Sequence, residues 1–582
     1  MKTVLVGINS KYIHTMLSVR YLAASINESL HSSAGSFCVY REFSVNMSES
    51  SVLEALYNEA ADVYCFSTYI FNVDFVLRVV KSLKKLKSEA VIILGGPEVT
   101  YENEAILRQN PEIDFISCGE GEVSLPLLIN SLSETPFLSK EKVFAAKICG
   151  VSYLYNSRYI STPFASPICD LDSLPFPYTD EELAAAGTKI LYYESSRGCP
   201  FGCSYCLSSA EKGVRFKSVK RVCEELDEFI DSGVGLVKFI DRTFNADRKR
   251  AEEIITYIIG RDNLKTSFHF EISPWLVTEE LVSLLKTARP GLFQLEIGIQ
   301  STNPETLSAI NRTVPFEKVK EAILRLKETP VHLHVDLIAG LPYETFEIFG
   351  KSFDDVMELE CHCLQLGFLK LLKGTQIAHQ PQHQYVCGEN SPYQVLSNKY
   401  ISYPQLCKLE KIAEILDLYL NSDLCEFLSA SNLKKIFGVT PFEFYCGFAD
   451  FLENLKFFDV LHSTVSLFGY LYCYLSSKYD PELSESLVAF EYYRFTGSVN
   501  FPQWLRTLPN KAECLELLND EESLLPLMDE ETKEIFLSMD KKHWFRKSQL
   551  VTFKFDSNGA KMPRKVLFLY GKTTKIVSIS AF

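Results

Sequence analysis

Two blocks of alternating strand and helix patterns constrain the fold of this 582-residue chain more than any other feature. In the first block, short apolar runs such as KTVLVGI and AVIILGG alternate with amphipathic segments such as DFVLRVVKSLKKLK. Buried strands separated by such helices form a parallel sheet with helices on both faces. The block therefore predicts an α/β, doubly wound, Rossmann-like domain over residues 1–135.

The second block runs over residues 186–375 and repeats the same rhythm. Its predicted strands include ILYYESSRG, VKFIDRTFN, SFHFEIS, LFQLEIGIQS and VHLHVDLIAGLP, with helical segments such as SVKRVCEELDEFIDSG between them. Repeated strand–helix units form a complete or partial (β/α) barrel, whose active site lies at the carboxyl ends of the strands. We expect a partial barrel with its site at that end.

The remaining segments have no such rhythm. Residues 136–185 read as a hairpin, GVSYLYNSRYISTP, followed by a proline-rich linker. Residues 376–582 predict a mostly helical C-terminal domain of unknown role, with a late strand pair, QLVTFKFD and KVLFLYGK. The apolar stretch FFDVLHSTVSLFGYLYCYLSSK is interrupted by polar residues, so we interpret it as a buried helix and expect no membrane association.

The charge and cysteine content restrict the partners and the compartment. A formal net charge of −15 argues against a strong electrostatic hold on nucleic acid or on an anionic membrane. The chain has 17 cysteines, and its start, MKTVLVGINSKYIH, lacks the pattern of a secretion signal. We therefore expect a cytoplasmic protein with reduced thiols.

Three cysteines gather in the loop after the first strand of the second block, at Cys199, Cys203 and Cys206 in CPFGCSYC. A structural zinc site needs four ligands, and the nearby sequence supplies no fourth Cys or His at finger spacing. Zinc remains the competing interpretation. Three thiolates with one position left open favour a [4Fe–4S] cluster in which one iron is free for another ligand.

Small and polar residues follow the predicted strands of the first domain. Glycines there let a large ligand approach the backbone, and hydroxyl and amide groups offer hydrogen bonds. Such loops also join strands to helices in α/β proteins that bind nothing at them. The candidate ligand contacts are Ser67, Thr68, Asn72, Gly95, Gly96, Gly119 and Gly121.

The motif CPFGCSYC, with the aromatic Tyr205, resembles the CxxxCx(aromatic)C hallmark of the radical S-adenosylmethionine (radical SAM) superfamily. The resemblance covers about residues 190–375. It implies that the three cysteines are catalytic: they hold a [4Fe–4S] cluster whose open iron binds S-adenosylmethionine (SAM). An electron from the cluster then cleaves SAM to methionine and a 5′-deoxyadenosyl radical.

Two further segments carry the same resemblance. QLEIGIQSTNPETLSAINR is similar to the fifth-strand region of the superfamily, and DLIAGLPYET is similar to its sixth-strand turn. By resemblance, the residues around SAM are Tyr205, Glu296, Gly298, Gln300, Ser301 and Arg312. The superfamily often has a Gly-Gly-Glu-like turn after the second strand, where this chain has FIDRTFN. Asp241, Arg242 or Thr243 offers another polar contact there, and a structural charge pair between Asp241 and Arg242 is the alternative.

The first domain narrows the resemblance to cobalamin-binding radical SAM enzymes. GGPEV and DFISCGEGE resemble their N-terminal domain over about residues 1–135, which implies cobalamin as a third cofactor. The usual Asp-x-His-x-x-Gly loop is absent and His14 lies outside such a motif, so we expect base-off cobalamin without a histidine ligand. Methylthiotransferase N-terminal domains have related folds without cobalamin.

Pairing these two domains favours methylation of an unactivated carbon of a small molecule or peptide, with a low-potential electron donor such as flavodoxin or ferredoxin as partner. Radical cyclisation or rearrangement is an alternative on the same architecture. A second alternative is methylthiolation of tRNA, although Cys38, Cys65 and Cys118 are widely spaced and no basic appendage is evident. A cobalamin or redox sensor is the non-enzymatic alternative.

Overall fold

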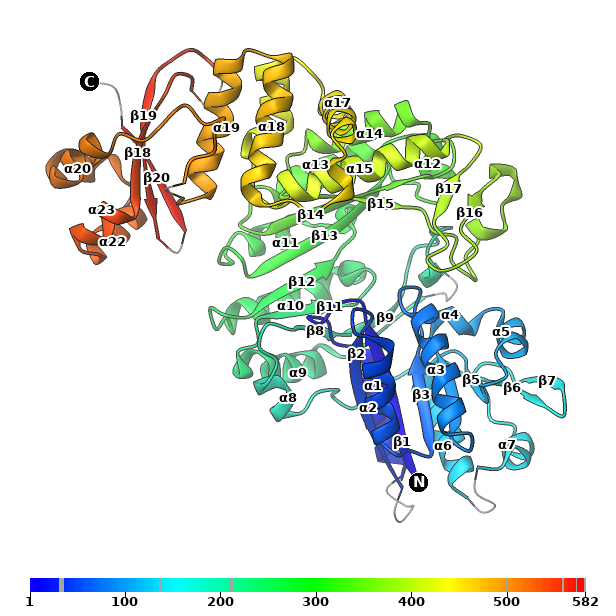
Figure 1. The fold of residues 1–582 in the computed structure, drawn as a ribbon. Helices are drawn as coiled ribbons and strands as arrows, with labels where there is room; N and C mark the ends of the chain where they lie inside the picture. The colour runs from blue at the N-terminus through cyan, green and yellow to red at the C-terminus, as the bar shows by residue number, and fades with distance from the viewer. Residues whose placement is uncertain are drawn as a thin grey trace. The chain divides into compact units, whose positions relative to one another are not determined.

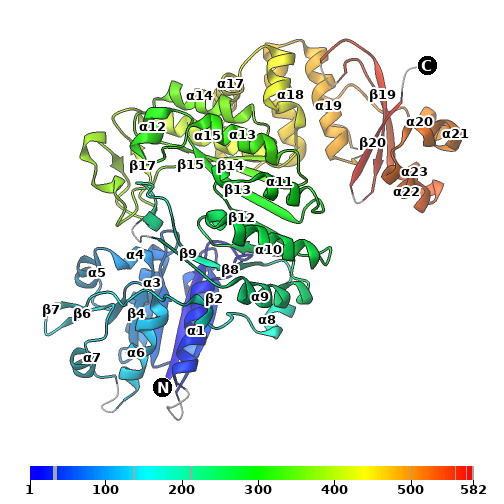
Figure 2. The same ribbon diagram turned by 180° about the vertical axis from the view of Figure 1, so that it is seen from behind.

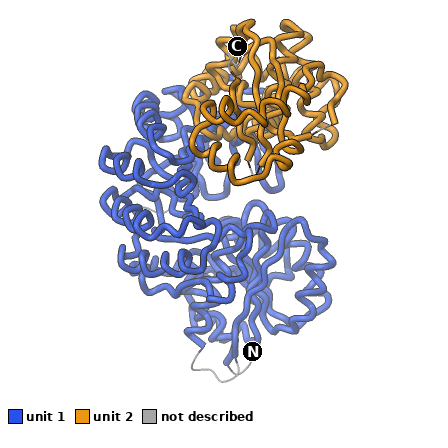
Figure 3. The backbone as a smooth tube through the Cα atoms, turned by 90° about the vertical axis from the view of Figure 1, so that its left-hand side faces the viewer, with its two compact units in different colours: residues 1–345, 367–403 blue, residues 346–366, 404–582 orange. Residues whose placement is uncertain are grey.

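The computed structural model describes residues 1–30, 36–134, 138–209, 213–498, 500–556, 559–571 and 573–579. The chain divides into two compact units (Figure 3). The first unit comprises residues 1–345 and 367–403, and the second comprises residues 346–366 and 404–582. Both strand–helix blocks of the sequence lie almost entirely in the first unit.

A seven-stranded sheet with the order β2-β1-β3-β4-β5-β6-β7 forms the N-terminal part of the first unit (Figure 1). Its strands are β1 (Lys2–Asn9), β2 (Phe37–Ser44), β3 (Val63–Ser67), β4 (Val91–Gly95), β5 (Phe115–Ser117), β6 (Val151–Tyr155) and β7 (Arg158–Ser161). Strands β1 to β5 pair in parallel, as predicted, whereas β6 and β7 are antiparallel. The hairpin that we assign to the linker therefore extends this sheet, because β5 leaves a free edge for it.

Helices cover both faces of this sheet (Figure 2). Apolar side chains of α1 (Leu17–Leu30) and α6 (Gly121–Ser133) share one core with the sheet. Those of α2 (Glu49–Asn58) and α3 (Val73–Leu86) share the core on the opposite face. The shorter helices between its strands are α4 (Pro97–Thr100), α5 (Asn103–Gln109) and α7 (Lys140–Ala146), whereas α8 (Asp180–Ala184) lies in the linker after the hairpin.

A six-stranded sheet with the order β15-β14-β13-β12-β11-β8 follows along the chain. Its strands are β8 (Ile190–Tyr193), β11 (Leu236–Phe239), β12 (Ser267–Glu271), β13 (Phe293–Gln300), β14 (His332–Ala339) and β15 (Cys363–Phe368). The intervening helices are α9 (Val219–Ser232), α10 (Arg248–Gly260), α11 (Glu279–Leu285), α12 (Pro304–Ala309) and α13 (Phe316–Leu326). The sheet stays open at β8, so the barrel is partial, as predicted.

The residue alternation along these strands gives the second sheet two different faces. One face is apolar and buried, with Leu191, Val237 and Leu295 among its side chains. The other is polar: in β11, β12 and β13 it carries Lys238, Glu271 and Glu296. A barrel whose interior side is polar offers its lumen to ligands rather than filling it with a core.

The second unit is mostly helical. Its helices are α14 (Phe346–Met357), α15 (Tyr403–Tyr419), α16 (Ala430–Asn432), α17 (Pro441–Asn454), α18 (Thr464–Lys478), α19 (Pro481–Phe495), α20 (Lys511–Asn519), α21 (Glu521–Leu524), α22 (Glu530–Ser538) and α23 (Lys541–Arg546). The rings of Phe346 and Phe353 in α14 pack against Phe442 of α17, which explains why α14 belongs to this unit. The segment that we interpret as a buried helix contains α18.

The late strand pair is β18 (Ser548–Phe553) and β19 (Arg564–Tyr570), to which β20 (Thr574–Ile579) adds a third antiparallel strand. No helix within the described ranges has the length and apolar character needed to cross a bilayer.

Candidate functional site

Asp241 fixes the backbone that leads from β8 into the cysteine loop. Its buried carboxylate accepts hydrogen bonds from the N–H groups of Ser195 (2.8 Å) and Ser196 (3.1 Å) and from the Ser195 hydroxyl (2.5 Å). Burial raises the pKa of Asp241, and these donors offset part of the rise. Asp241 thus serves the loop and makes no charge pair with Arg242, whose nearest carboxylate is Glu271 at 3.8 Å.

The cysteine loop begins in a two-stranded hairpin, β9 (Ser196–Cys199) and β10 (Gly213–Phe216). Gly198 stands directly before Cys199 with φ of +97°. A Cβ at this position would lie 2.3 Å from the carbonyl oxygen of Gly213. Only glycine fits there, so the SRGC sequence sets the direction in which Cys199 leaves the hairpin.

The three cysteines are free thiols, with Cys203 buried and the other two half-buried. Arg312 reaches this loop: its Nη1 lies 3.7 Å from Cys203 Sγ and 3.4 Å from the Tyr205 hydroxyl. Its Nη2 donates to the carbonyl oxygen of Gly298 at 2.5 Å. Burial raises the pKa of the Cys203 thiol, and the Arg312 charge lowers it in part. A cation beside the sulfur favours the thiolate that a metal cluster requires.

Among the residues that the structure describes, no three Cys, His, Asp or Glu side chains converge on the position of a single metal ion. A [4Fe–4S] cluster is larger than one ion and binds each cysteine at a different iron. The donor set fits the cluster.

Gln300 ends β13 in an unusual conformation. Its φ is +74°, and the ladder between β13 and β14 shifts register between Gly298 and Gln300. A Cβ on Gly298 would lie 2.1 Å from Gln300 Nε2, so the glycine makes room for this amide. Gln300 Oε1 is buried and has no hydrogen-bond partner among the described residues. Such an atom is suited to a ligand donor, as expected for a residue beside SAM.

Two other predicted SAM contacts have protein partners. Glu296 lies 3.0 Å from Lys238 Nζ and 2.8 Å from His269 Nε2. Burial raises its pKa, but the hydrogen bond from His269 and the charge of Lys238 outweigh burial and lower the pKa to about 2. The Ser301 hydroxyl donates to Glu344 at 2.5 Å. The hydroxyl of Thr243, in the FIDRTFN segment that differs from the superfamily pattern, lies 3.4 Å from Cys199 Sγ.

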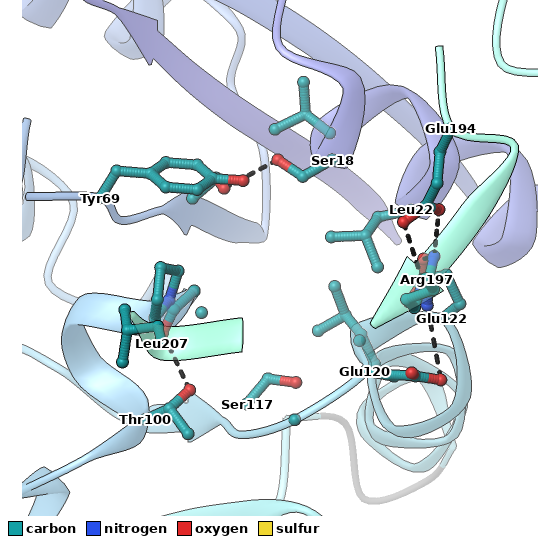
Figure 4. A pocket seen from close by; sticks show the side chains of 18 of the residues that line it. Ser18, Leu22, Tyr69, Thr100, Ser117, Glu120, Glu122, Glu194, Arg197 and Leu207 are labelled. Atoms are coloured by element: carbon teal, nitrogen blue, oxygen red, sulfur yellow. Dashed lines mark hydrogen bonds and ion pairs between the residues drawn. The ribbon is translucent and has the colours of Figure 1, made fainter. Parts of the chain in front are cut away.

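A cavity of about 420 Å³ opens at the carboxyl ends of the first sheet (Figure 4). Five of the seven candidate contacts line it, namely Ser67, Gly95, Gly96, Gly119 and Gly121. Gly96 has φ of +110°, and a Cβ there would lie 2.3 Å from the carbonyl oxygen of Thr68. This wall of glycine and serine fits a large ligand that must approach the sheet closely.

The other two candidates are absent from the cavity lining and hold its loops from behind. The Thr68 hydroxyl donates to the carbonyl oxygen of Gly95 at 2.6 Å. The Asn72 amide donates to Ile8 and Ser67, and its oxygen accepts from the N–H of Tyr69. Both side chains form hydrogen bonds with backbone groups, so their polarity serves the loops and does not indicate contact with a ligand.

The opposite wall carries charges that sequence reasoning missed. Arg197 Nη2 lies 2.7 Å from Glu194 and 2.9 Å from Glu122, and its Nη1 lies 3.4 Å from Glu120 (Figure 4). Burial raises the pKa of Glu194, and Arg197 offsets part of that rise. The sequence signal for these charges is GEGE at residues 119–122, whose two glutamates contact Arg197 while its two glycines are the predicted ligand contacts. The cavity lining also includes Arg242, Gly198 and Leu207, so the cysteine loop and the first sheet share it.

His14 stays outside the lining of this cavity. Its Nδ1 lies 2.7 Å from the Tyr192 hydroxyl, and the N–H of Ile190 donates to the carbonyl oxygen of Ile13 at 2.7 Å. The loop after β1 therefore covers the open edge of the second sheet at β8.

Three family models match the chain. The B12 binding domain matches residues 3–129 and the Radical SAM superfamily matches residues 193–356. A third, described as Protein of unknown function (DUF4080), matches residues 381–568.

Curated relatives match the chain at low identity. An uncharacterized methyltransferase of Pyrococcus horikoshii is 27% identical over 57% of this chain and 71% of its own length. The anaerobic magnesium-protoporphyrin IX monomethyl ester cyclase of Cereibacter sphaeroides is 24% identical over 53% of this chain and 51% of its own length. The cobalamin-dependent radical SAM methyltransferase TokK of Streptomyces tokunonensis is 25% identical, over 52% of this chain. The match spans about half of the cyclase and 45% of TokK.

Solved structures have a similar fold. One is OxsB, a cobalamin-dependent SAM radical enzyme with aqua-cobalamin and SAM bound. The match covers 92% of this chain and 78% of the OxsB chain, with a TM-score of 0.55 and 14% identity. Another is TsrM of Kitasatospora setae, a radical SAM methyltransferase with cobalamin and a [4Fe–4S] cluster bound. The match covers 67% of this chain and 76% of the TsrM chain, with a TM-score of 0.52 and 16% identity.

The fold and the two matched cofactor domains define a radical SAM enzyme with an N-terminal B12-binding domain. Residues 3–129 form a B12 binding domain and residues 193–356 form a radical SAM domain, and the cofactors of these two domains are cobalamin, a [4Fe–4S] cluster and SAM.

Proposed function

We propose that this enzyme methylates an unactivated carbon of a small molecule or peptide. The observation that carries the proposal is the shared cavity. Gly198 and Leu207, the chain neighbours of Cys199 and Cys206, line it together with the glycine loops of the first sheet. When bound, cobalamin supplies a methyl donor, and the cluster with SAM supplies a hydrogen-abstracting radical. One cavity beside both sites would bring donor and abstractor to the same substrate.

The residues of the cysteine loop and of β13 have distinct tasks in this proposal. Cys199, Cys203 and Cys206 hold the cluster. Arg312 places a positive charge beside Cys203. Its hydrogen bond to the carbonyl oxygen of Gly298 fixes the end of β13. Gln300 Oε1, which is buried without a protein partner among the described residues, accepts a hydrogen bond from SAM.

The walls of the cavity bind cobalamin and exclude water. Ser67, Gly95, Gly96, Gly119 and Gly121 receive the ligand at the edge of the sheet. Apolar side chains line the cavity between these loops and the cysteine loop: Leu5, Val19, Leu22, Leu125 and Ile240. Their role is to keep solvent from a reactive substrate.

The polar face of the second sheet supports a polar substrate. Lys238, Glu271 and Glu296 project from neighbouring strands, and each side chain is about one quarter exposed. Charges of both signs on one face can orient a molecule that carries several polar groups. A low-potential donor such as flavodoxin or ferredoxin would supply the electrons that the cluster needs.

The accompanying products test this function. Reconstituted, reduced enzyme with cobalamin, SAM and cell extract should form 5′-deoxyadenosine, methionine and S-adenosylhomocysteine, all dependent on the extract. Extract-dependent 5′-deoxyadenosine without S-adenosylhomocysteine would contradict methylation and favour cyclisation or rearrangement. No cleavage of SAM under any condition would favour a sensor.

A further inference from the structure

Residues 370–402 form a strap that leaves the second sheet after β15 and contains β16 (Val386–Cys387) and β17 (Val395–Ser397). The strap belongs to the first unit together with the cofactor domains. The match to the DUF4080 family begins at residue 381, so it includes most of the strap. The first part of that region therefore lies with the cofactor sites, whereas residues 404–568 lie in the second unit.

The strap contacts the cysteine loop directly. The N–H of Ile377 donates to the carbonyl oxygen of Ser204 at 2.9 Å. Ser204 is fully buried between Cys203 and Tyr205 in the chain. The Asn311 amide, which donates to the carbonyl oxygen of Gly202 at 3.2 Å, lies 3.4 Å from Gln376 Oε1. The start of the strap thus braces the segment between the second and third cysteines.

The strap also contacts two loops that line the cobalamin cavity. Glu98 of α4 is 5% exposed, and its Oε1 accepts a hydrogen bond from the Tyr393 hydroxyl at 2.6 Å. Lys373 Nζ lies 3.1 Å from the same oxygen. The Ser391 hydroxyl donates to the carbonyl oxygen of Ile70. Tyr69 and Pro97, the chain neighbours of these acceptors, line the cavity, as do Thr100 and Tyr101 shortly after Glu98.

The base of the strap is fixed to the end of β14. The N–H of Leu369 donates to the carbonyl oxygen of Ala339 at 2.9 Å, and that of Val395 donates to Leu369 at 2.8 Å. The Asn398 amide donates to the carbonyl oxygen of Gly340 at 2.8 Å. Tyr393 and Lys373 therefore hold Glu98 from a support that is anchored in the second sheet.

We infer that the strap is a positioning element in which Tyr393 and Lys373, through Glu98, hold the α4 loop in the shape that binds cobalamin. A buried carboxylate that loses its donors would turn toward water and carry α4 with it. Apparent affinity falls with the fraction of molecules whose site has the competent shape. The inference rests on cobalamin binding and not on methyl transfer, so it stands even if the reaction is a cyclisation.

The test compares Tyr393→Phe with Tyr385→Phe in the full-length protein with its cluster. Both changes remove one hydroxyl from the strap, but the buried Tyr385 hydroxyl has no hydrogen-bond partner among the described residues. Cobalamin release into excess competitor is followed by absorbance. Tyr393→Phe should release cobalamin about tenfold faster, as expected for one hydrogen bond to a charged group. Tyr385→Phe should release it at the wild-type rate.

A second measurement separates positioning from general loss of stability. Hydrogen exchange at residues 97–109 should accelerate in Tyr393→Phe, with and without cobalamin, while iron content and unfolding midpoint match those of Tyr385→Phe. In a Glu98→Ala background, which removes the accepting oxygen, Tyr393→Phe should add little, because the two residues act as one unit. Unchanged exchange at residues 97–109, or the same acceleration in both Tyr→Phe variants, would overturn the inference.

Discussion

Arg197 Nη2 lies 2.9 Å from Glu122 Oε1, although Arg197 belongs to the hairpin that leads into the cysteine loop and Glu122 to the first turn of α6. Glu120 and Glu194 contact the same guanidinium. The four side chains are between 10% and 16% exposed. This cluster joins a loop of the first sheet to the strand that presents Cys199.

Replacing Arg197 by Met should destabilise the protein strongly. It leaves three nearly buried carboxylates without their shared cation, a change that typically costs about 3–5 kcal/mol. Chemical denaturation of the cluster-free protein measures the effect. Arg261→Met is the matched control, because Arg261 contacts two carboxylates but is 42% exposed, so the unfolding midpoint of this variant should change little. Equal midpoints for both variants would contradict this account of the cluster.

The triple variant Cys199→Ala, Cys203→Ala, Cys206→Ala should bind no [4Fe–4S] cluster after anaerobic reconstitution, because all three thiolates of the site are lost. Mössbauer spectroscopy and iron analysis measure the content. A control variant changes the exposed Cys149, Cys169 and Cys473 to Ala and should keep the wild-type content. Cluster content in the first variant equal to that of the wild type would refute the assignment.

Arg312→Met should make the midpoint potential of the cluster more negative. Reduction adds negative charge, and the guanidinium 3.7 Å from Cys203 Sγ stabilises that charge. A redox titration followed by electron paramagnetic resonance gives the potential. Arg289→Met, which removes a cation bound to Asp262, should leave the potential unchanged. A potential that stays the same or rises in Arg312→Met would show that its charge does not act on the cluster.

Glu296→Gln should change how stability depends on pH. The pKa of Glu296 is about 2 in the folded protein against an ordinary value of 4.5, so the carboxylate stabilises the fold above pH 4.5 and loses this effect as the pH falls toward 2. The shift corresponds to an upper bound of about 3 kcal/mol at pH 7. The stability gap between wild type and variant should therefore narrow from pH 7 to pH 3.5. A constant gap, or the same effect in the exposed control Glu321→Gln, would contradict the prediction.

Local patterns predicted both sheets because strand and helix periods are visible in the sequence. The missed strand β2 contains Arg41 and Glu42, which interrupt its apolar run, and Glu42 pairs with Arg20 of α1 instead of facing water. A hairpin pattern does not say which sheet it joins, so the sequence alone places β6 and β7 in the linker. Helix α14 belongs to the second unit because its rings pack against Phe442, which lies far along the chain. A local sequence pattern cannot predict a contact of this kind.

The candidate site was predicted where residues follow strand ends and missed where contacts are long-range. Gly95, Gly96 and Gly119 follow buried strands, and the structure places them in the cavity lining. Thr68 and Asn72 share that sequence context, yet their side chains bond to the backbone. The strap has no periodicity, and the partners Tyr393 and Glu98 lie almost 300 residues apart.

The most direct test of the proposed function follows the methyl group itself. Reduced, reconstituted enzyme with cobalamin is incubated with cell extract and SAM that carries a trideuterated methyl group, and products are searched by mass spectrometry. We predict a small molecule or peptide that gains the deuterated methyl on carbon, together with 5′-deoxyadenosine, and no product from the triple cysteine variant. Extract-dependent 5′-deoxyadenosine without transfer of the label would contradict methylation, and label recovered in tRNA would show that the substrate is a nucleic acid.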